Sequence, residues 1–499
     1  MKHLIILPIL VPLFMGAFLL MRPRLAARTA RGLSLLATWT LLPLALWLLQ
    51  RASSGQLEVY ALGDWPAPFG IVLLLDRLAA LMLVTVAVLA GCAALYACRG
   101  DDERGPDFHA LFQFQLLGIN GAFLTGDLFN LFVFFEILLI ASYALLVHGA
   151  GPARVRAGLH YVVLNLVGSA LFLIGIGLLY GLLGTLNLAD LGLRVANADP
   201  AQAPLLAAAG FLLLVVFGLK GAILPLYFWL PGAYSAASAP VAALFAIMTK
   251  VGLYAIVRVF LLVFGSAAGP LAGFVLPWLW PLAALTLAAG VFGALAAHHL
   301  KALLGYLVVI SVGMLLSGVA LGSVAGLAAA LFYLVHSTWI AGALFLLADL
   351  VAQQRGPQGD TLNSGPQLAN PRLLGGLFFL GAVSVAGLPP FPGFLGKVML
   401  LQATGTTWPA LIIWPVVLLG GLGMLIALSR AGTALFWRSN SAALGVRLDR
   451  VQLAAVLGLL AGSPLLMVLA APLHDYALET ARQLLDVAPY FAIVRGVGP

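Results

Sequence analysis

Five titratable side chains stand inside long apolar segments of this sequence: Glu136, Lys220, Lys250, His336 and Lys397. A charge at the middle of a bilayer costs at least about 2.5 to 3.5 kcal/mol, so such residues usually face a protein interior or a hydrated cavity and mark ion pathways. Carboxylate, ammonium and imidazole groups also exchange protons readily when burial and neighbouring charges change their proton affinity. The residue types therefore predict a path for protons or other ions.

Glu136 is the candidate carboxylate of this path. It lies about eight residues into an apolar segment, among the aromatic residues of Phe129 to Leu138, and no other acid stands so deep in a segment. The functional interpretation is a group that takes up and releases protons. The alternative is a structural ion pair that fixes two helices to each other.

The three lysines are the candidate cations. Lys220 lies between Gly218 and Gly221, and Lys397 follows Gly396. A buried lysine gives up its proton readily because desolvation disfavours the ammonium form. The alternative for Lys220 is a side chain that reaches toward the membrane surface.

Lys250 begins a polar stripe within an apolar segment. Tyr254 and Arg258 follow at four and eight positions, so the three share one helical face. Arg258 is nearer the segment end, where structural pairing or snorkelling is an equal alternative. His336 lies in a second polar turn and suits a relay between lysines, or it is a hydrogen-bonded core residue.

Other polar residues are weaker candidates. Asp76 and Arg77 are adjacent and predict a local structural pair, and His298 and His299 predict a solvated loop, with a role in proton entry left open. Cys92 and Cys98 stand six positions apart, which predicts packed side chains and fits no CxxC metal pair. The sequence contains no nucleotide-binding loop or HExxH motif, so we expect no cofactor and leave any metal ligands unassigned.

The elements that position these residues are membrane helices. The chain has 499 residues, of which 63% are hydrophobic and 8% charged, against about 25% charged in soluble domains. The formal charge of +8 does not indicate nucleic-acid binding, because the basic residues fall in short loops. We therefore predict an all-α integral membrane protein with a single polytopic domain over residues 1–499.

Hydrophobic segments long enough to cross a bilayer number about fourteen. The first, Leu4 to Met21, is not expected to be a signal peptide, because it is long enough to span. The predicted spans are 3–22, 32–50, 70–98, 109–125, 128–148, 157–184, 206–230, 239–265, 271–297, 302–321, 324–351, 373–403, 408–436 and 451–473.

Two of these spans contain helix-breaking residues. The seventh ends in Leu224–Gly232 with two prolines, and the twelfth contains Leu388–Gly393 with three. Broken helices at corresponding positions are typical of inverted repeats in transporters. We therefore predict three N-terminal helices over 1–108, a five-helix repeat over 109–265 (spans 4 to 8), a second over 271–436 (spans 9 to 13) and a C-terminal helix over 451–473.

The distribution of lysine and arginine predicts the orientation. Cytoplasmic loops are enriched in these residues. Odd-numbered loops hold most of them, from the arginines at 22–31 to those at 430–450, whereas even-numbered loops hold Arg51 and Arg194. We therefore expect both termini outside the cytoplasm, in the periplasm or its equivalent.

Together these residues resemble the antiporter-like subunits shared by Mrp-type cation/proton antiporters and respiratory complex I. The segments Phe135–Tyr143 (FEILLIASY) and His336–Asp349 (HSTWIAGALFLLAD) are similar to D subunits of the multisubunit Na⁺/H⁺ antiporter, also called Mnh or Pha. The resemblance covers nearly the whole chain. It lacks one feature of some relatives, a lysine shortly after His336, since Thr338 to Ala341 contains none.

The resemblance implies fourteen helices with two inverted five-helix repeats, and half-channels joined by a hydrated axis of lysines and histidine. It further implies that Glu136 and Lys220 form a coupled pair, that Lys250 and His336 form the axis, and that Lys397 is the terminal site. The implied function is proton translocation coupled to Na⁺ or another monovalent cation, with other membrane subunits as partners, in a bacterial cell membrane. The alternatives are a proton-pumping module of a respiratory or hydrogenase complex and an assembly scaffold.

Overall fold

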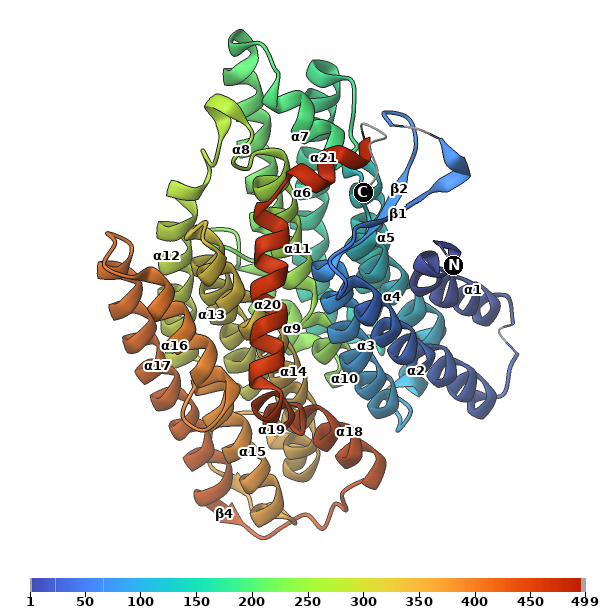
Figure 1. The fold of residues 1–499 in the computed structure, drawn as a ribbon. Coiled ribbons are helices and arrows are strands. Elements are labelled where there is room, and N and C mark those ends of the chain that lie inside the picture. The colour runs from blue at the N-terminus through green and yellow to red at the C-terminus, as the bar shows by residue number, and fades with distance from the viewer. Residues whose placement is uncertain (1, 23, 66, 495–499) are drawn as a thin grey trace.

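The computed structural model describes residues 2–22, 24–65 and 67–494, and nearly all elements in it are helices (Figure 1). Among these residues, twelve helices are long and apolar enough to cross a membrane. The prediction of an all-α membrane protein is confirmed. Figure 1 shows a bundle in which most helices lie side by side along its length. The β1/β2 hairpin, α7 and α21 lie toward one end of the bundle, and β4 lies at the other.

The N-terminal part supplies three long helices. They are α1 (Leu7–Met21), α2 (Ala27–Ala52) and α3 (Arg77–Ala97). Strands β1 (Glu58–Ala61) and β2 (Val72–Leu75) pair antiparallel between α2 and α3. Most of α3 is buried, because α2, α4, α10, α14 and α18 all pack on it.

The next part corresponds to the first predicted repeat. Its helices are α4 (Phe108–Leu124), α5 (Leu128–Val147), α6 (Pro152–Leu183), α7 (Leu188–Ala196), α8 (Ala203–Gly221), α9 (Trp229–Ala236), α10 (Ala239–Phe245) and α11 (Met248–Val257). A π-helical segment, Arg258–Val263, continues α11. The part corresponding to the second predicted repeat contains α12 (Leu276–Ala296), α13 (Leu300–Ala320), α14 (Val324–Arg355), α15 (Pro371–Ala386), α16 (Pro392–Thr404) and α17 (Ala410–Gly432). A short parallel pair, β3 (Gly365–Pro366) and β4 (Ser439–Ser441), lies at its end.

The predicted helix breaks are present. The seventh span ends as a helix at Gly221 and resumes as α9 at Trp229, and the twelfth divides into α15 and α16 at Gly387–Phe391. Ala222 and Gly387 follow the first half-helices in the left-handed conformation, with φ of 58° and 75°. Proline without an amide donor and a left-handed residue both stop helical hydrogen bonding.

The eighth span contains an interruption that the sequence did not indicate. It divides into α10 and α11 at Ala246–Ile247, directly before Met248. The two residues at the division have ordinary helix-compatible side chains and αR backbone angles. Neither proline nor glycine nor a left-handed residue therefore accounts for the interruption.

The C-terminal part differs from the single predicted helix over 451–473. It forms α18 (Arg450–Leu460), α19 (Gly462–Val468), α20 (Ala470–Leu485) and α21 (Ala488–Val494). Helix α20 packs along α14 and α3, with Ala477, Ala481 and Leu484 buried on that side (Figure 1). Its sequence alternates polar and apolar residues at helical spacing, so a search for continuous apolar segments ends too early.

The difference between twelve and fourteen spans has a simple origin. Helix α4 has 17 residues, and the halves α15 and α16 have 16 and 13, so all three are shorter than a typical membrane helix. Counting α4 and the α15/α16 pair as spans would give fourteen. That count and the inverted repeats stay predictions.

Candidate functional site

Two helices lie at the centre of the bundle and carry two of the predicted site residues. In the spans Ala239–Val263 and Val324–Gln358, every residue of the most apolar stretch is buried within the chain. The first span carries Lys250 on α11 and the second carries His336 on α14. Both side chains are at most 1% exposed. These two residues therefore occupy the protein interior, not the lipid-facing surface.

Glu136 and Lys220 are brought together by α6. The Ser169 hydroxyl on α6 donates a hydrogen bond to a carboxylate oxygen of Glu136 on α5. Lys220 Nζ, at the end of α8, donates to the same hydroxyl oxygen at 3.2 Å. No direct ion pair within 4.0 Å joins Glu136 and Lys220, both of which the structure describes. The predicted pair is therefore connected through one serine.

Asn165 completes the surroundings of Lys220. Its main-chain oxygen and its side-chain oxygen accept from Lys220 Nζ at 3.2 and 3.3 Å. Asn165 and Ser169 stand four positions apart, so they project from the same face of α6. Lys220 is only 4% exposed. A buried ammonium group here has three oxygen acceptors and no direct carboxylate contact.

The helix that carries Lys250 approaches the end of α8 closely. A Cβ atom on Gly252 would lie 2.4 Å from the Gly221 nitrogen, so the two backbones can touch only because residue 252 is glycine. Lys250 Nζ donates to the Ser311 hydroxyl of α13 at 3.0 Å. Within the described residues, no hydrogen bond joins Lys250 to Lys220 or to His336. Proton transfer across these intervals requires water or side-chain movement.

His336 on α14 and Lys397 on α16 both donate hydrogen bonds to the last turn of α15. His336 Nε2 donates to the Ser384 carbonyl oxygen at 3.2 Å, and Lys397 Nζ donates to the Ala386 carbonyl oxygen at 2.5 Å. The last carbonyl groups of a helix have no partners within the helix, so a break deep in a membrane protein supplies acceptors for such donors. The break thus holds the imidazole and the ammonium group near each other.

Gly393 makes this arrangement possible. A Cβ atom there would lie 2.3 Å from the Ser384 oxygen and 2.8 Å from His336 Nε2. Any larger residue would displace the carbonyl or the imidazole. The glycine after the proline cluster is therefore part of the site.

Asp76 does not form the expected local pair with Arg77. Its carboxylate binds Arg258 with two hydrogen bonds of 2.5 and 2.6 Å, and the two side chains are 0% and 1% exposed. Tyr254 accepts a hydrogen bond from Arg258 Nε, and Tyr490 of α21 donates to Asp76. Arg77 instead donates to the Ser53 carbonyl oxygen. The polar stripe of α11 thus ends in a buried structural ion pair.

Sequence reasoning missed the neutral polar residues of the site: Asn165, Ser169, Ser311 and Ser384. The spacing of Asn165 and Ser169 on one face of an apolar helix was the available signal. Single serines such as Ser311 carry no such signal, because serine in a helix commonly bonds to its own backbone. His299, by contrast, lies in an exposed loop and contacts Asp360 at 3.3 Å.

A multi-span bundle with broken helices and buried lysines defines a membrane transport protein. The chain belongs to the family described as NADH:quinone oxidoreductase/Mrp antiporter, transmembrane, whose model matches residues 125–423.

Relatives and a solved structure agree with this assignment. The chain is 44% identical to the D subunit of the probable K⁺/H⁺ antiporter of Rhizobium meliloti (strain 1021), over 97% of this chain and 96% of the relative. It is 40% identical to the D subunit of the Na⁺/H⁺ antiporter of Bacillus subtilis (strain 168), over 88% and 87%. The fold matches a chain of the Mrp complex from Dietzia sp. DQ12-45-1b with a TM-score of 0.90 and 27% identity, over the full length of both chains.

Proposed function

We propose that this chain is the proton-translocating, antiporter-like subunit of a multisubunit monovalent cation/proton antiporter of the Mrp type. Its partners are other membrane subunits of that complex, and its substrates are H⁺ and Na⁺ or another monovalent cation. It is a component of a secondary transporter in the bacterial cell membrane rather than an enzyme. The names of the relatives support the antiporter assignment, and one contact carries the mechanism: Ser169 joins Glu136 to Lys220.

In this mechanism, the orientation of the Ser169 hydroxyl couples the protonation state of Glu136 to that of Lys220. A serine hydroxyl has one proton to donate and lone pairs to accept with. While its proton points to Glu136, its oxygen faces the ammonium group of Lys220. When Lys220 loses a proton, or Glu136 gains one, the charge that favours this hydroxyl orientation is gone and the hydroxyl can rotate. The pair thereby gates proton transfer into the interior.

The onward route runs through Lys250 and His336 to Lys397. Its support is that all three side chains are buried and each donates to a neutral oxygen rather than to a carboxylate. A lysine with a neutral partner can lose its proton without leaving an unpaired buried anion. This favours reversible proton transfer over permanent ion pairing.

Neutral substitutions test the proposal. Glu136→Gln and Lys220→Met, in complexes that still assemble, should abolish cation-dependent proton exchange in membrane vesicles. Glu479→Gln is a control for the loss of an exposed acid, because Glu479 pairs with Arg482 three positions away on the same helix. Wild-type exchange in either site variant would contradict the proposal. Loss of assembly in every neutral variant would favour the scaffold alternative.

The family description also includes NADH:quinone oxidoreductase, and it therefore supports a second candidate function. The same chain would then be a proton-pumping module of a redox complex. Purification with its native partners distinguishes the two functions. Flavin or iron–sulfur proteins in the purified complex would support the redox module, and further antiporter components would support the first proposal.

We further propose that both termini face the outside of the cell. The α1–α2 loop would then face the cytoplasm. Thr29 lies in the first turn of α2, next to this loop, and is exposed, so Thr29→Cys in a variant lacking Cys92 and Cys98 provides a reporter. An impermeant thiol reagent should label it in inverted vesicles and not in intact cells. Labelling from outside intact cells would reverse the orientation.

A further inference from the structure

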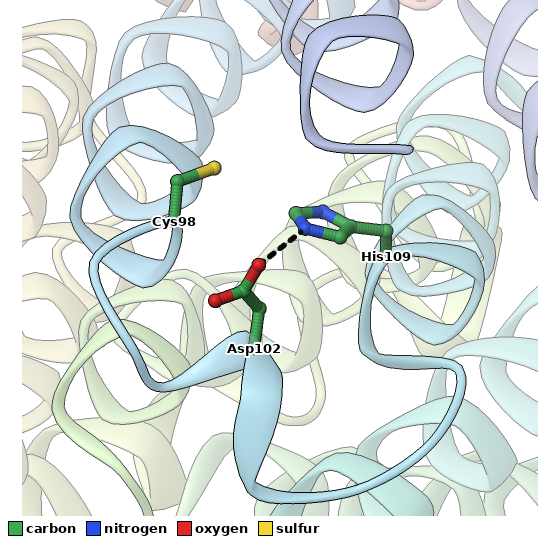
Figure 2. Close-up of side chains that lie close together, drawn as sticks. All are labelled: Cys98, Asp102 and His109. Atoms are coloured by element: carbon green, nitrogen blue, oxygen red, sulfur yellow. Dashed lines mark hydrogen bonds and ion pairs between the residues drawn. The ribbon is translucent and has the colours of Figure 1, made fainter. Parts of the chain in front are cut away.

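A cluster of metal-ligating side chains lies apart from the proton path, where α3 turns into α4. Cys98 follows α3, Asp102 lies in the connecting loop and His109 is in the first turn of α4 (Figure 2). One ligand atom from each lies within 4.8 Å of the other two. Cys98 and His109 are each 8% exposed, and the Asp102 side chain is 4% exposed. Figure 2 shows the three side chains converging from separate turns of the backbone.

The three groups suit one class of ion. Zinc binds thiolate sulfur at about 2.3 Å and imidazole nitrogen or carboxylate oxygen at about 2.0 to 2.2 Å. A tetrahedral shell with these bonds separates its ligand atoms by about 3.5 Å. His109 Nε2 already lies 3.1 Å from Asp102 Oδ2. The remaining separations are at most 4.8 Å, so they have to shorten by at most about 1.3 Å, which side-chain rotation can supply.

Two further observations describe the surroundings of the cluster. His109 Nε2 is the nitrogen that faces Asp102, so it is the ligand atom that an ion between the two residues would bind. The other ring nitrogen, Nδ1, is buried and has no hydrogen-bond partner in the described part of the chain, so no second hydrogen bond prevents the ring from turning toward an ion. A cavity of 340 Å³ is lined by Asp102, Glu103 and His109. The cavity gives an ion a route to Asp102 and His109 and gives a fourth coordination position to water, whereas Cys98 lies behind these two residues and does not line it.

Arg31 is the competitor that a metal ion has to displace. Its guanidinium binds Asp102 with two hydrogen bonds, of 2.5 and 2.8 Å, and also binds Glu103 at 2.5 Å. A cation that takes over Asp102 leaves Arg31 paired with Glu103. The replacement of Arg31 by a metal ion at Asp102 therefore leaves no side-chain charge without a partner. Two negative ligands, a Cys98 thiolate and the Asp102 carboxylate, balance the two positive charges of the ion, and the thiol proton leaves to water.

We propose that Cys98, Asp102 and His109 bind one divalent transition-metal ion of the zinc type, with water from the adjacent cavity as the fourth ligand. The bound ion ties the end of α3 to the start of α4. This inference does not depend on the proton path, since none of the three residues contacts Glu136, Lys220, Lys250, His336 or Lys397.

Cobalt(II) is the probe that tests the site, because cobalt–thiolate bonds produce a charge-transfer absorption band. The purified full-length chain, in its assembled complex, is titrated with cobalt and then with zinc. The wild-type complex should gain a sulfur–cobalt absorption band and should bind one more equivalent of cobalt than the Cys98→Ser complex. The band should disappear when zinc is added. His109→Gln should weaken cobalt binding at least tenfold. Cys92→Ser is the matched control, because Cys92 is also a buried cysteine and lies six positions earlier, within α3.

Several outcomes would overturn the proposal. They are the absence of a cobalt band in the wild type, a band of equal size in Cys98→Ser, and an equal loss in Cys92→Ser. Elution of each variant as an intact complex shows that misfolding is not the cause. Arg31→Gln provides an independent measurement: it should bind cobalt at least as tightly as wild type, because the competitor is gone. Weaker binding in Arg31→Gln would contradict the exchange between Arg31 and the metal.

Discussion

Glu136 and Lys220 are joined through a single hydroxyl group and not by direct contact. Ser169 donates to the carboxylate and accepts from the ammonium group at 3.2 Å. A direct buried ion pair would hold both groups in their charged forms, because separating the charges in a low dielectric is costly. An intervening hydroxyl weakens that attraction and can reorient. This geometry suits a pair that has to change its protonation state.

Substitution of Ser169 is the first test of this role. Ser169→Ala should lower exchange at least tenfold without loss of the complex, because Lys220 then loses its link to Glu136. Ser169→Thr keeps a hydroxyl and should retain most activity. The measurement is cation-driven dissipation of a pH gradient in vesicles. Ser317→Ala is the matched control, because this buried hydroxyl bonds to its own helix at the Gly313 carbonyl. Equal activity of Ser169→Ala and wild type would remove Ser169 from the mechanism.

The broken helix α15/α16 gives a second test through its glycine. Gly393→Ala places a methyl group within 2.3 Å of the Ser384 oxygen and within 2.8 Å of His336 Nε2. The carbonyl that holds the imidazole must move, so exchange should fall at least tenfold. Gly376→Ala on α15 is the control, because a Cβ atom there meets nothing within 4 Å. Comparable activity of the two alanine variants would show that the position of His336 is not critical.

The sequence predicted which lysines and which histidine lie buried in the bundle and where two helices break, whereas their role in proton transfer stays a prediction. Lysine or glutamate in an apolar segment costs enough free energy to need a reason, and proline without an amide donor interrupts any helix. Such residues are recognisable one at a time. The placement of Lys250 and His336 on the two most enclosed helices follows the same logic, since a charge avoids the lipid.

The partners of those residues could not be predicted in the same way. Ser169 and Ser311 are small neutral residues that are common in membrane helices, and their importance depends on which helix packs opposite. Asp76 meets Arg258 across 182 positions of sequence, although Arg77 is its neighbour in the chain. The division of α10 from α11 at Ala246 has no proline or glycine that would reveal it in the sequence. Which residues become partners depends on how distant helices pack, and the hydrophobic pattern of the sequence does not predict that packing.

The Asp76–Arg258 pair predicts a large effect on stability. Removing one partner of a buried ion pair costs about 3 to 5 kcal/mol, because it leaves an uncompensated charge. Asp76→Leu should therefore lower the thermal midpoint of the detergent-solubilised chain sharply. The double variant Asp76→Leu/Arg258→Met should recover much of the loss, since both charges are gone. Breaking the exposed Glu479–Arg482 pair should cost at most about 1 kcal/mol. Failure of the double variant to recover would show that the other contacts of Asp76, its cap on the Ala79 amide and its hydrogen bond from Tyr490, matter more than charge balance.

Asp127 and Asp449 predict opposite responses of stability to pH, although both carboxylates cap helices. Asp127 accepts from the Asn130 amide at the start of α5, and burial raises its pKa to about 6, partly offset by that hydrogen bond. Its protonated form is thus favoured by folding. The free energy of unfolding should fall by up to about 3 kcal/mol as pH rises from the unfolded pKa through about 6. Asp127→Asn keeps the cap and should be more stable than wild type at pH about 7.5, with the gap closing at pH about 4.

Asp449 caps α18 and binds Arg99 at 2.6 Å. Its partial burial alone would raise its pKa, but Arg99 and the amides of Val451 and Gln452 lower the pKa below the usual value. Its charged form is thus favoured by folding, and its contribution is present above the unfolded pKa and lost as pH falls. Asp449→Asn should be less stable than wild type at neutral pH, with the difference shrinking in acid. Thermal midpoints of both asparagine variants across pH provide the measurement. Greater stability of both variants at neutral pH would show that burial dominates at both caps, and lower stability of both would show that the contacts of the charged carboxylate dominate.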